Sequence, residues 1–292
     1  MTAADRQSGG VLLVIAACAC FATLDTGSKY LNPVVPMMML IWIRYVIQML
    51  FIGLVLVPRQ DGAPFATRHP LLQVVRGLLL LLCSMLAFLS LKYLPVGEFT
   101  AIVMISPLLV TLLSAVALKE QVSVLRWLLV FGGFLGALIV IRPGSEAFDI
   151  RMLLPLALVV ANASFQVVTS KLSKTDAAGT THFITGLVGL MVTTLILPLV
   201  WQSPPGMLTW VILLAIGVIG TVGHYFLILG YSRAPASSLT PYLYSHIAFA
   251  TLGGWLVFSH VPDRWALLGI LIITICGCVG LLATAREKRA AG

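Results

Sequence analysis

Asp25 and Arg44 stand at similar depths in two consecutive apolar stretches of this chain. A charge at the centre of a bilayer costs about 2.5–3.5 kcal/mol on insertion scales, so each needs a partner or a wet cavity. The spacing favours a buried Asp25–Arg44 ion pair with a structural or a coupling role. Lys29, one helical turn from Asp25, competes for the same carboxylate. Without the pair, Arg44 suits a substrate carboxylate, and Asp25 suits an ammonium group or a proton.

Two histidines in the second half of the chain also share a depth. His224 and His246 lie in neighbouring apolar stretches, and a shift of the numbering by 140 places Ser84 and Ser106 at the corresponding positions. We expect these four polar side chains to line a central cavity. The alternative is that each serine bonds to its own helix backbone and each histidine caps a local carbonyl.

Further polar candidates lie on two other stretches. Asn162 and Gln166 are four residues apart, so they share a helix face. Uncharged amides suit a neutral or zwitterionic ligand, and they equally suit hydrogen bonds between helices. Tyr242 and Ser245 share a face with His246 through i, i+3, i+4 spacing, and we count them as candidate cavity residues.

Met104 and Pro107 flank Ser106. Methionine adapts to ligands of varied shape, although core packing is an equally available role. Pro107 removes a backbone hydrogen bond in the middle of a helix and is expected to kink it. Such a kink can frame a cavity or act as a gate hinge, and a static packing kink is the alternative.

The elements that position these side chains are membrane-spanning helices. Of the 292 residues, 60% are hydrophobic and only 10% are charged, whereas soluble domains have roughly 25% charged residues. About 20 mostly apolar residues span the hydrocarbon as a helix. We predict ten spans joined by short polar connections: 10–31, 36–57, 71–91, 96–118, 124–141, 152–171, 180–201, 207–231, 237–259 and 265–284.

The net charge of +8 reflects orientation. If the N-terminus is cytoplasmic, most lysines and arginines fall on the cytoplasmic side, as the positive-inside rule requires. We therefore expect both termini in the cytoplasm of a bacterium, a multi-pass protein of its inner (plasma) membrane, and no nucleic-acid partner.

No pattern indicates a cofactor, a metal site or catalysis. All five cysteines lie within predicted spans, where they act as small apolar residues. The chain has no Walker A sequence, no HExxH and no GxSxG. We therefore do not expect an enzyme.

An internal repeat relates the two halves. The shift of 140 aligns Gly77 with Gly217 and Pro95 with Pro235. Because each half has five spans, an odd number, the second repeat must be inverted in the membrane. Inverted repeats place a single site near mid-membrane in many transporters. We predict an all-α membrane protein with a first repeat at 1–145 and a second at 146–292 around a central cavity, and a monomer, since one chain supplies both halves.

The stretch from residue 76 to 144 resembles a known family. Its marks are Tyr-Leu-Pro at 93–95, Ser-Pro at 106–107, Leu-Lys-Glu at 118–120 and Arg-Pro-Gly at 142–144. These resemble the EamA-type repeat of the drug/metabolite transporter superfamily, and more narrowly bacterial amino-acid exporters of the YddG type. The second half departs from the pattern at His246 and His260. The resemblance implies ten helices, a central cavity and transport of small organic metabolites.

The prediction for function is a secondary transporter that exports amino acids, above all hydrophobic or aromatic ones, by alternating access. The first alternative is a nucleotide-sugar or phosphorylated-metabolite translocator, but phosphate usually calls for several basic side chains, and only Arg44 is placed deep by the predicted spans. The second alternative is a lipid-modifying membrane enzyme. With Asp25 held by Arg44, transport is expected to continue without a pH gradient.

Overall fold

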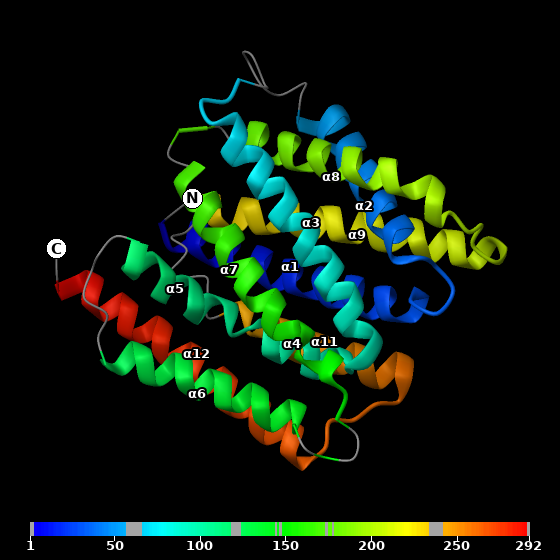
Figure 1. The fold of residues 1–292 in the computed structure, drawn as a ribbon. Coiled ribbons are helices and arrows are strands. Elements are labelled where there is room, and N and C mark those ends of the chain that lie inside the picture. The colour runs from blue at the N-terminus through cyan, green and yellow to red at the C-terminus, as the bar shows by residue number, and fades with distance from the viewer. Residues whose placement is uncertain are drawn as a thin grey trace.

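Every regular element in the described part of the chain is a helix (Figure 1). The structure is a computed structural model, and it describes residues 3–56, 66–117, 124–143, 145, 148–172, 175–176, 178–233 and 242–290. The first half contains α1 (Ala3–Leu31), α2 (Met37–Phe51) continued by the π-helical turn η1 (Ile52–Leu56), α3 (Pro70–Tyr93), α4 (Val96–Val103), α5 (Ser106–Ala117) and α6 (Val124–Ile141). The second contains the 3₁₀ turn η3 (Ile150–Leu153), α7 (Leu154–Leu172), α8 (Ala178–Val200), α9 (Gly206–Arg233), α11 (Ser245–Phe258) and α12 (Arg264–Ala290).

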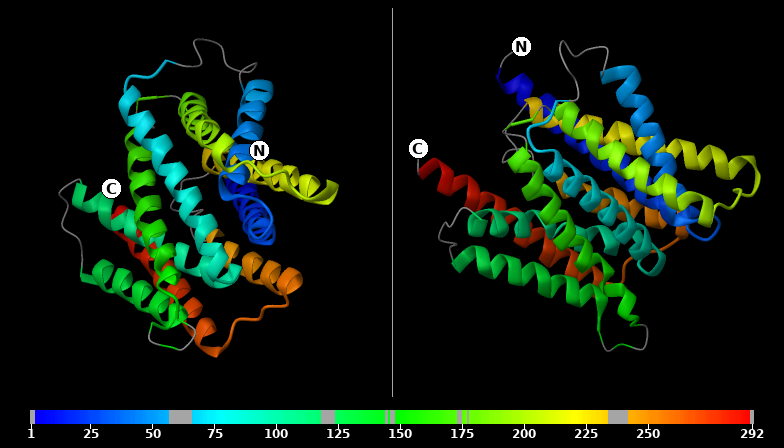
Figure 2. Two further views of the ribbon diagram at one scale, coloured as in Figure 1. Left: turned by 45° about the vertical axis from the view of Figure 1, so that its right-hand side comes forward. Right: turned by 45° about the horizontal axis from the view of Figure 1, so that its top comes forward.

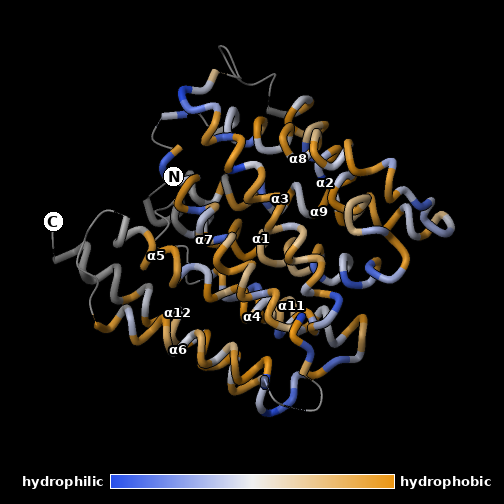
Figure 3. The backbone as a smooth tube through the Cα atoms, in the orientation of Figure 1, coloured by the Kyte–Doolittle hydropathy of each residue, from blue (hydrophilic) through white to orange (hydrophobic). Residues whose placement is uncertain are grey.

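The lengths and composition of these helices fit a bilayer. Six of them are long and apolar enough to cross it, and four shorter apolar segments match the remaining predicted spans. In hydrocarbon a helix satisfies its own backbone groups, which is why apolar runs of this length fold as helices. Hydrophobic residues follow the helices and hydrophilic ones gather at their ends (Figure 3). The predicted all-helical, multi-pass membrane fold is confirmed.

Successive spans run in opposite directions, so α1 begins and α12 ends on the same side of the bundle (Figure 1). We call this the termini side, and we call the side where α1 ends the far side. The helices α1–α6 and α7–α12 form the two inverted repeats. Pro235 and the Leu-Lys-Glu motif at 118–120 lie outside the described residues.

Helices from different repeats pack against each other. α1 lies against α9 and α11, α4 against α11, and α6 against α12, and Figure 2 shows α6 and α12 side by side in both views. The α6–α12 contact depends on glycine: a Cβ on Gly269 would lie 2.5 Å from the carbonyl oxygen of Gly136, and one on Gly132 would lie 2.8 Å from Sγ of Cys276. The Gly-x-x-x-Gly stretch of α6 therefore packs inside the chain.

The fourth span is broken where the sequence predicts a kink. α4 ends at Val103 and α5 begins at Ser106, because the ring nitrogen of Pro107 cannot donate to the carbonyl of Val103. The second repeat has a break at the equivalent residue, Tyr244, although Ile247 stands at the position of Pro107. The two breaks meet: the Tyr244 hydroxyl donates a hydrogen bond of 3.1 Å to the Met104 carbonyl.

Substitution of Gly269 tests the α6–α12 contact. Gly269→Ala places a methyl group against the backbone of α6, and we expect this overpacking to lower the free energy of unfolding by about 2 kcal/mol. A lower midpoint of thermal unfolding in detergent would report it. Gly254→Ala in α11 is the control, because a Cβ there has nothing within 4 Å. Equal midpoints for the two variants would contradict the close approach.

Candidate substrate cavity

Two small polar cavities lie among α1, α2, α3 and α9, and each has a volume of about 20 Å³, room for about one water molecule. Ile41, Arg44 and Ser84 line both. The first cavity is completed by Leu24, Asp25, Ser28, Ala87, Phe88 and Leu91. The second is completed by Tyr45, Gln48, Leu80 and His224. Side chains from both repeats thus surround one polar region inside the bundle.

Arg44 is the central side chain of this region. Within the described part of the chain, its guanidinium makes no hydrogen bond and no ion pair, although it faces both cavities. A guanidinium presents five N–H donors in a rigid planar arrangement that fits a carboxylate bidentately. Arg44 is therefore available to an anionic group that enters the cavities.

The expected Asp25–Arg44 ion pair is wrong for this structure. Oδ2 of Asp25 lies 3.3 Å from Nε2 of His246, because α1 packs against α11 and turns Asp25 toward it. The contact is within ion-pair distance if the imidazole is protonated, but the ring nitrogen is not aligned for a hydrogen bond. Lys29 does not compete for Asp25 either. Its ammonium donates to the carbonyls of Leu91 and Leu94 at 2.6 and 2.7 Å.

The two histidines both lie close to one aromatic ring. The ring of Phe21 is 4.8 Å from that of His224 in an edge-to-face arrangement, and 6.1 Å from that of His246. Ser84 and His224, equivalent positions in the two repeats, line the same cavity. His246 reaches the region through Asp25. The structure thus gathers three of the four predicted repeat-related positions around Phe21 and Arg44.

Ser106 lies in a different polar chain. It is 1% exposed, and its hydroxyl accepts a hydrogen bond of 3.4 Å from the Asn162 amide. The Asn162 carbonyl oxygen in turn accepts one of 3.3 Å from Gln166. These three side chains join α5 to α7. This arrangement matches the alternative interpretation, in which the amides form hydrogen bonds between helices.

The remaining candidates face away from the cavities. Tyr242 is 41% exposed, and the Ser245 hydroxyl bonds to the Tyr242 carbonyl at 2.7 Å. The side chain of Met104 packs against the main hydrophobic core. In the described residues, no group of three His, Cys, Asp or Glu side chains could hold a metal ion.

Arg76 is a second deep cation, and its burial was missed by the sequence analysis. It is 9% exposed in α3 and reaches α7 and α8, where Nε donates to Thr169 at 2.8 Å. Its other donors bond to Thr185 and to the Thr181 carbonyl, and its guanidinium stacks 4.6 Å from the Phe165 ring. The signal available in the sequence was the threonine-rich face of the seventh span. Unlike Arg44, Arg76 has partners for its donors.

On the termini side, Asp176 joins the segment before α3 to the segment before α8. Its carboxylate accepts hydrogen bonds from the Thr67 hydroxyl, from Nε2 of Gln73 at 2.8 Å and from the backbone N–H of Arg68 at 3.3 Å. These donors, Thr67 first and Gln73 second, lower the pKa of Asp176 to about 2. The ionised form is favoured because hydrogen bonds stabilise the charged carboxylate.

Comparison with known proteins gives two matches to one family model. The EamA-like transporter family matches residues 8–142 and again residues 150–283. The chain is 32% identical to the riboflavin transporter of Vibrio cholerae over 182 residues, which are 62% of this chain and 61% of that protein. It is 28% identical to the pseudopaline exporter CntI of Pseudomonas aeruginosa over 284 residues, 96% of this chain and 98% of that protein.

Two further similarities extend this result. The S-adenosylmethionine uptake transporter of Rickettsia felis is 25% identical over 207 residues, which cover 71% of this chain and 70% of that protein. A solved crystal structure, 18% identical in sequence, superposes with a TM-score of 0.68 over 96% of this chain and 99% of its own. At that identity the superposition shows the shared fold alone.

The Asp176 cluster predicts a pH dependence of stability. Because the pKa of this carboxyl is about 2 in the folded chain and about 3.9 in an unfolded one, its contribution is fully present above about pH 4 and is lost as the pH falls toward 2. At pH 6, Asp176→Asn should therefore have a lower midpoint of thermal unfolding than the parent. The difference between the two midpoints should shrink below pH 4. Thermal unfolding of both proteins across this range measures it. A gap that stays constant down to pH 2 would refute the assignment.

Proposed function

The chain belongs to the EamA-like transporter family, and we propose that it is a secondary carrier that exports amino acids, above all hydrophobic or aromatic ones, by alternating access. It is a multi-pass membrane protein that transports a small molecule, and it is not an enzyme. We also propose that it acts as a monomer in the bacterial inner membrane with both termini in the cytoplasm, as the distribution of basic residues favours.

The observation that supports an amino acid is the unpartnered Arg44 guanidinium in the same small cavity as Asp25. A zwitterion offers a carboxylate to Arg44 and an ammonium group to Asp25, which stands free of any guanidinium partner in the described residues. Ile41, Phe88 and Leu91 supply apolar surface beside these charges. That surface suits a hydrophobic or aromatic side chain.

The size of the cavities supports alternating access. Pockets that hold small organic ligands measure about 300–1,000 Å³, whereas these cavities measure about 20 Å³ each. These two cavities are therefore too small for such a ligand, and we propose that a substrate enters only when the helices separate on one side. The breaks at Met104 and Tyr244 are the proposed hinges, with Pro107 as the cause of the first.

The alternative of a phosphorylated metabolite fits less well. Phosphate recognition generally uses several basic donors. Arg76 is deep, but Thr169, Thr181 and Thr185 occupy its donors. Arg44 alone has unoccupied donors among the deep arginines, which matches one carboxylate. The Rickettsia relative is named for S-adenosylmethionine, a derivative of the amino acid methionine.

Counterflow in proteoliposomes tests this function. Vesicles containing the purified protein and an unlabelled amino acid should accumulate the same labelled amino acid from outside, across a panel that includes leucine, phenylalanine and tryptophan. Arg44→Gln should reduce this counterflow by about 10- to 100-fold, because a hydrogen bond to a charged group is lost. Lys92→Gln, at the exposed end of α3, is the control and should behave like the parent.

Two results would contradict the proposal. Undiminished counterflow by Arg44→Gln would remove the carboxylate contact. Counterflow of riboflavin by the parent protein, without counterflow of any amino acid in the panel, would replace the substrate class.

A further inference from the structure

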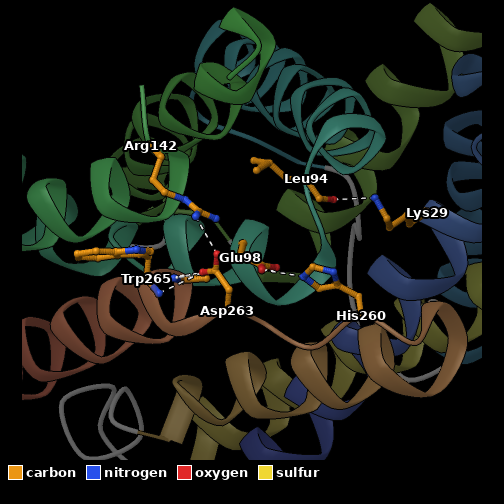
Figure 4. A network of polar contacts seen from close by, with 8 residues as sticks. Lys29, Leu94, Glu98, Arg142, His260, Asp263 and Trp265 are labelled. Atoms are coloured by element: carbon orange, nitrogen blue, oxygen red, sulfur yellow. Dashed lines mark hydrogen bonds and ion pairs between the residues drawn. The ribbon is translucent and has the colours of Figure 1, made fainter. Parts of the chain in front are cut away.

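Glu98 is a buried carboxylate on the far side (Figure 4), and it does not line either of the two cavities. It lies in the first turn of α4 and is 5% exposed. Its Oε1 lies 2.9 Å from Nε2 of His260, a residue of the connection between α11 and α12. Its Oε2 is fully buried and has no hydrogen-bond partner in the described residues. The carboxylate is thus held on one oxygen only.

The charges around Glu98 come from several elements. From α1, the Lys29 ammonium acts on Glu98 electrostatically, but its hydrogen bonds go to the end of α3 and it lies 5.8 Å from the Phe258 ring. From α6 and the start of α12, Arg142 and Asp263 pair with each other at 2.7 Å (Figure 4). His260 is therefore the titratable partner in direct contact with Glu98.

More exposed charges complete the surroundings of α4. Near the end of α3, Arg151 of η3 pairs with Asp149 at 3.0 Å and bonds to the Tyr93 hydroxyl, and Lys92 is exposed. These groups are engaged with one another or with water. In the described chain none of them contacts the Glu98 carboxylate, so its charge depends on His260, on Lys29 and on the N-terminus of α4.

The position of this pair makes it an element of the far side's closure. α4 packs against α11, its counterpart in the other repeat, and His260 follows the left-handed residue Ser259 that ends α11. Separation of α4 from α11 on the far side would remove His260 from Glu98. A buried carboxylate that loses its partner is strongly disfavoured in the charged form, so it takes up a proton or must be reached by water.

We propose that Glu98 and His260 form a proton-sensitive latch that holds the far side closed. This inference rests on the proposed alternating access. With Glu98 ionised and His260 protonated, the charge-assisted contact is strongest. Acid transfers a proton from water to the Glu98 carboxylate, and alkali removes one from the His260 imidazole. Either change weakens the contact, so the closed far side is most stable at intermediate pH and opens more readily on both sides of that range.

Hydrogen exchange of the purified full chain in lipid nanodiscs tests the latch without any substrate. Exchange of the α4 amides, corrected for the intrinsic pH dependence, would be followed by mass spectrometry from pH 5 to 9. The parent should show a minimum of exchange at intermediate pH. At the pH of the parent's minimum, the α4 amides of Glu98→Gln should exchange about tenfold faster than those of the parent. The exchange rate of this variant should not depend on pH after the same correction. His260→Gln keeps a donor for the carboxylate, so it should keep the acid limb and lose the alkaline one.

Arg142→Gln is the matched control. It breaks another polar contact of the far side, Arg142–Asp263, without altering the Glu98–His260 pair, so it should preserve both limbs of the profile. A flat profile for the parent, or an unchanged one for both Glu98→Gln and His260→Gln, would overturn the latch. If the parent shows the minimum but no amino acid undergoes counterflow, the latch stands and the proposed substrate falls.

Discussion

The hydrocarbon of a bilayer offers no hydrogen-bond partner, so each polar group within a span must find one inside the protein. The structure meets this constraint in several ways. Buried threonines such as Thr185 and Thr221 bond to the carbonyl one turn earlier, and Arg76 is surrounded by threonines of two other helices. Arg44 is an exception in the described residues, and so are the Tyr45 hydroxyl and Nε2 of Gln48, which belong to residues that line the same cavity and also have no hydrogen-bond partner. The same constraint that stabilises the helices thus supports this region as the proposed substrate site.

The break in each repeat is subject to the same requirement, that backbone carbonyls and N–H groups find hydrogen-bond partners inside the protein. Pro107 leaves carbonyls of α4 without their usual donors, and the hydroxyl of Tyr244 supplies one donor to the Met104 carbonyl. Tyr244 itself marks the break of the second repeat. The interruption of the first repeat is therefore supported by a side chain of the second, and this hydrogen bond joins the two spans at the point where each is least regular. A movement of one span at this point is therefore expected to displace the other.

Much of this architecture follows from the sequence. Properties that vary only along the chain can be counted directly, and they include the length of each span, the positions of glycine and proline, and the odd number of spans per repeat. Depth is also one-dimensional in this sense, which is why His224 and His246 could be placed at one level and Asp25 and Arg44 at another. The rotation of a helix about its own axis is not a one-dimensional property, because it depends on the helices that pack against it. The sequence offered Arg44 and Lys29 as partners for Asp25, but the packing of α1 against α11 places Asp25 beside His246 instead. Arg76 lies within the predicted span 71–91, but its position near the start of that span did not show that its side chain turns toward α7 and α8.

The contact between Gly136 and Gly269 has a consequence for biosynthesis. α6 is complete when fewer than half of the residues have been made, whereas α12 is synthesised after every other described helix. Until then, the glycine face of α6 has no partner and is exposed to lipid or to the insertion machinery. The first repeat is therefore inserted with one helix face unpacked. When α12 is inserted, it completes the second repeat and covers this face of the first.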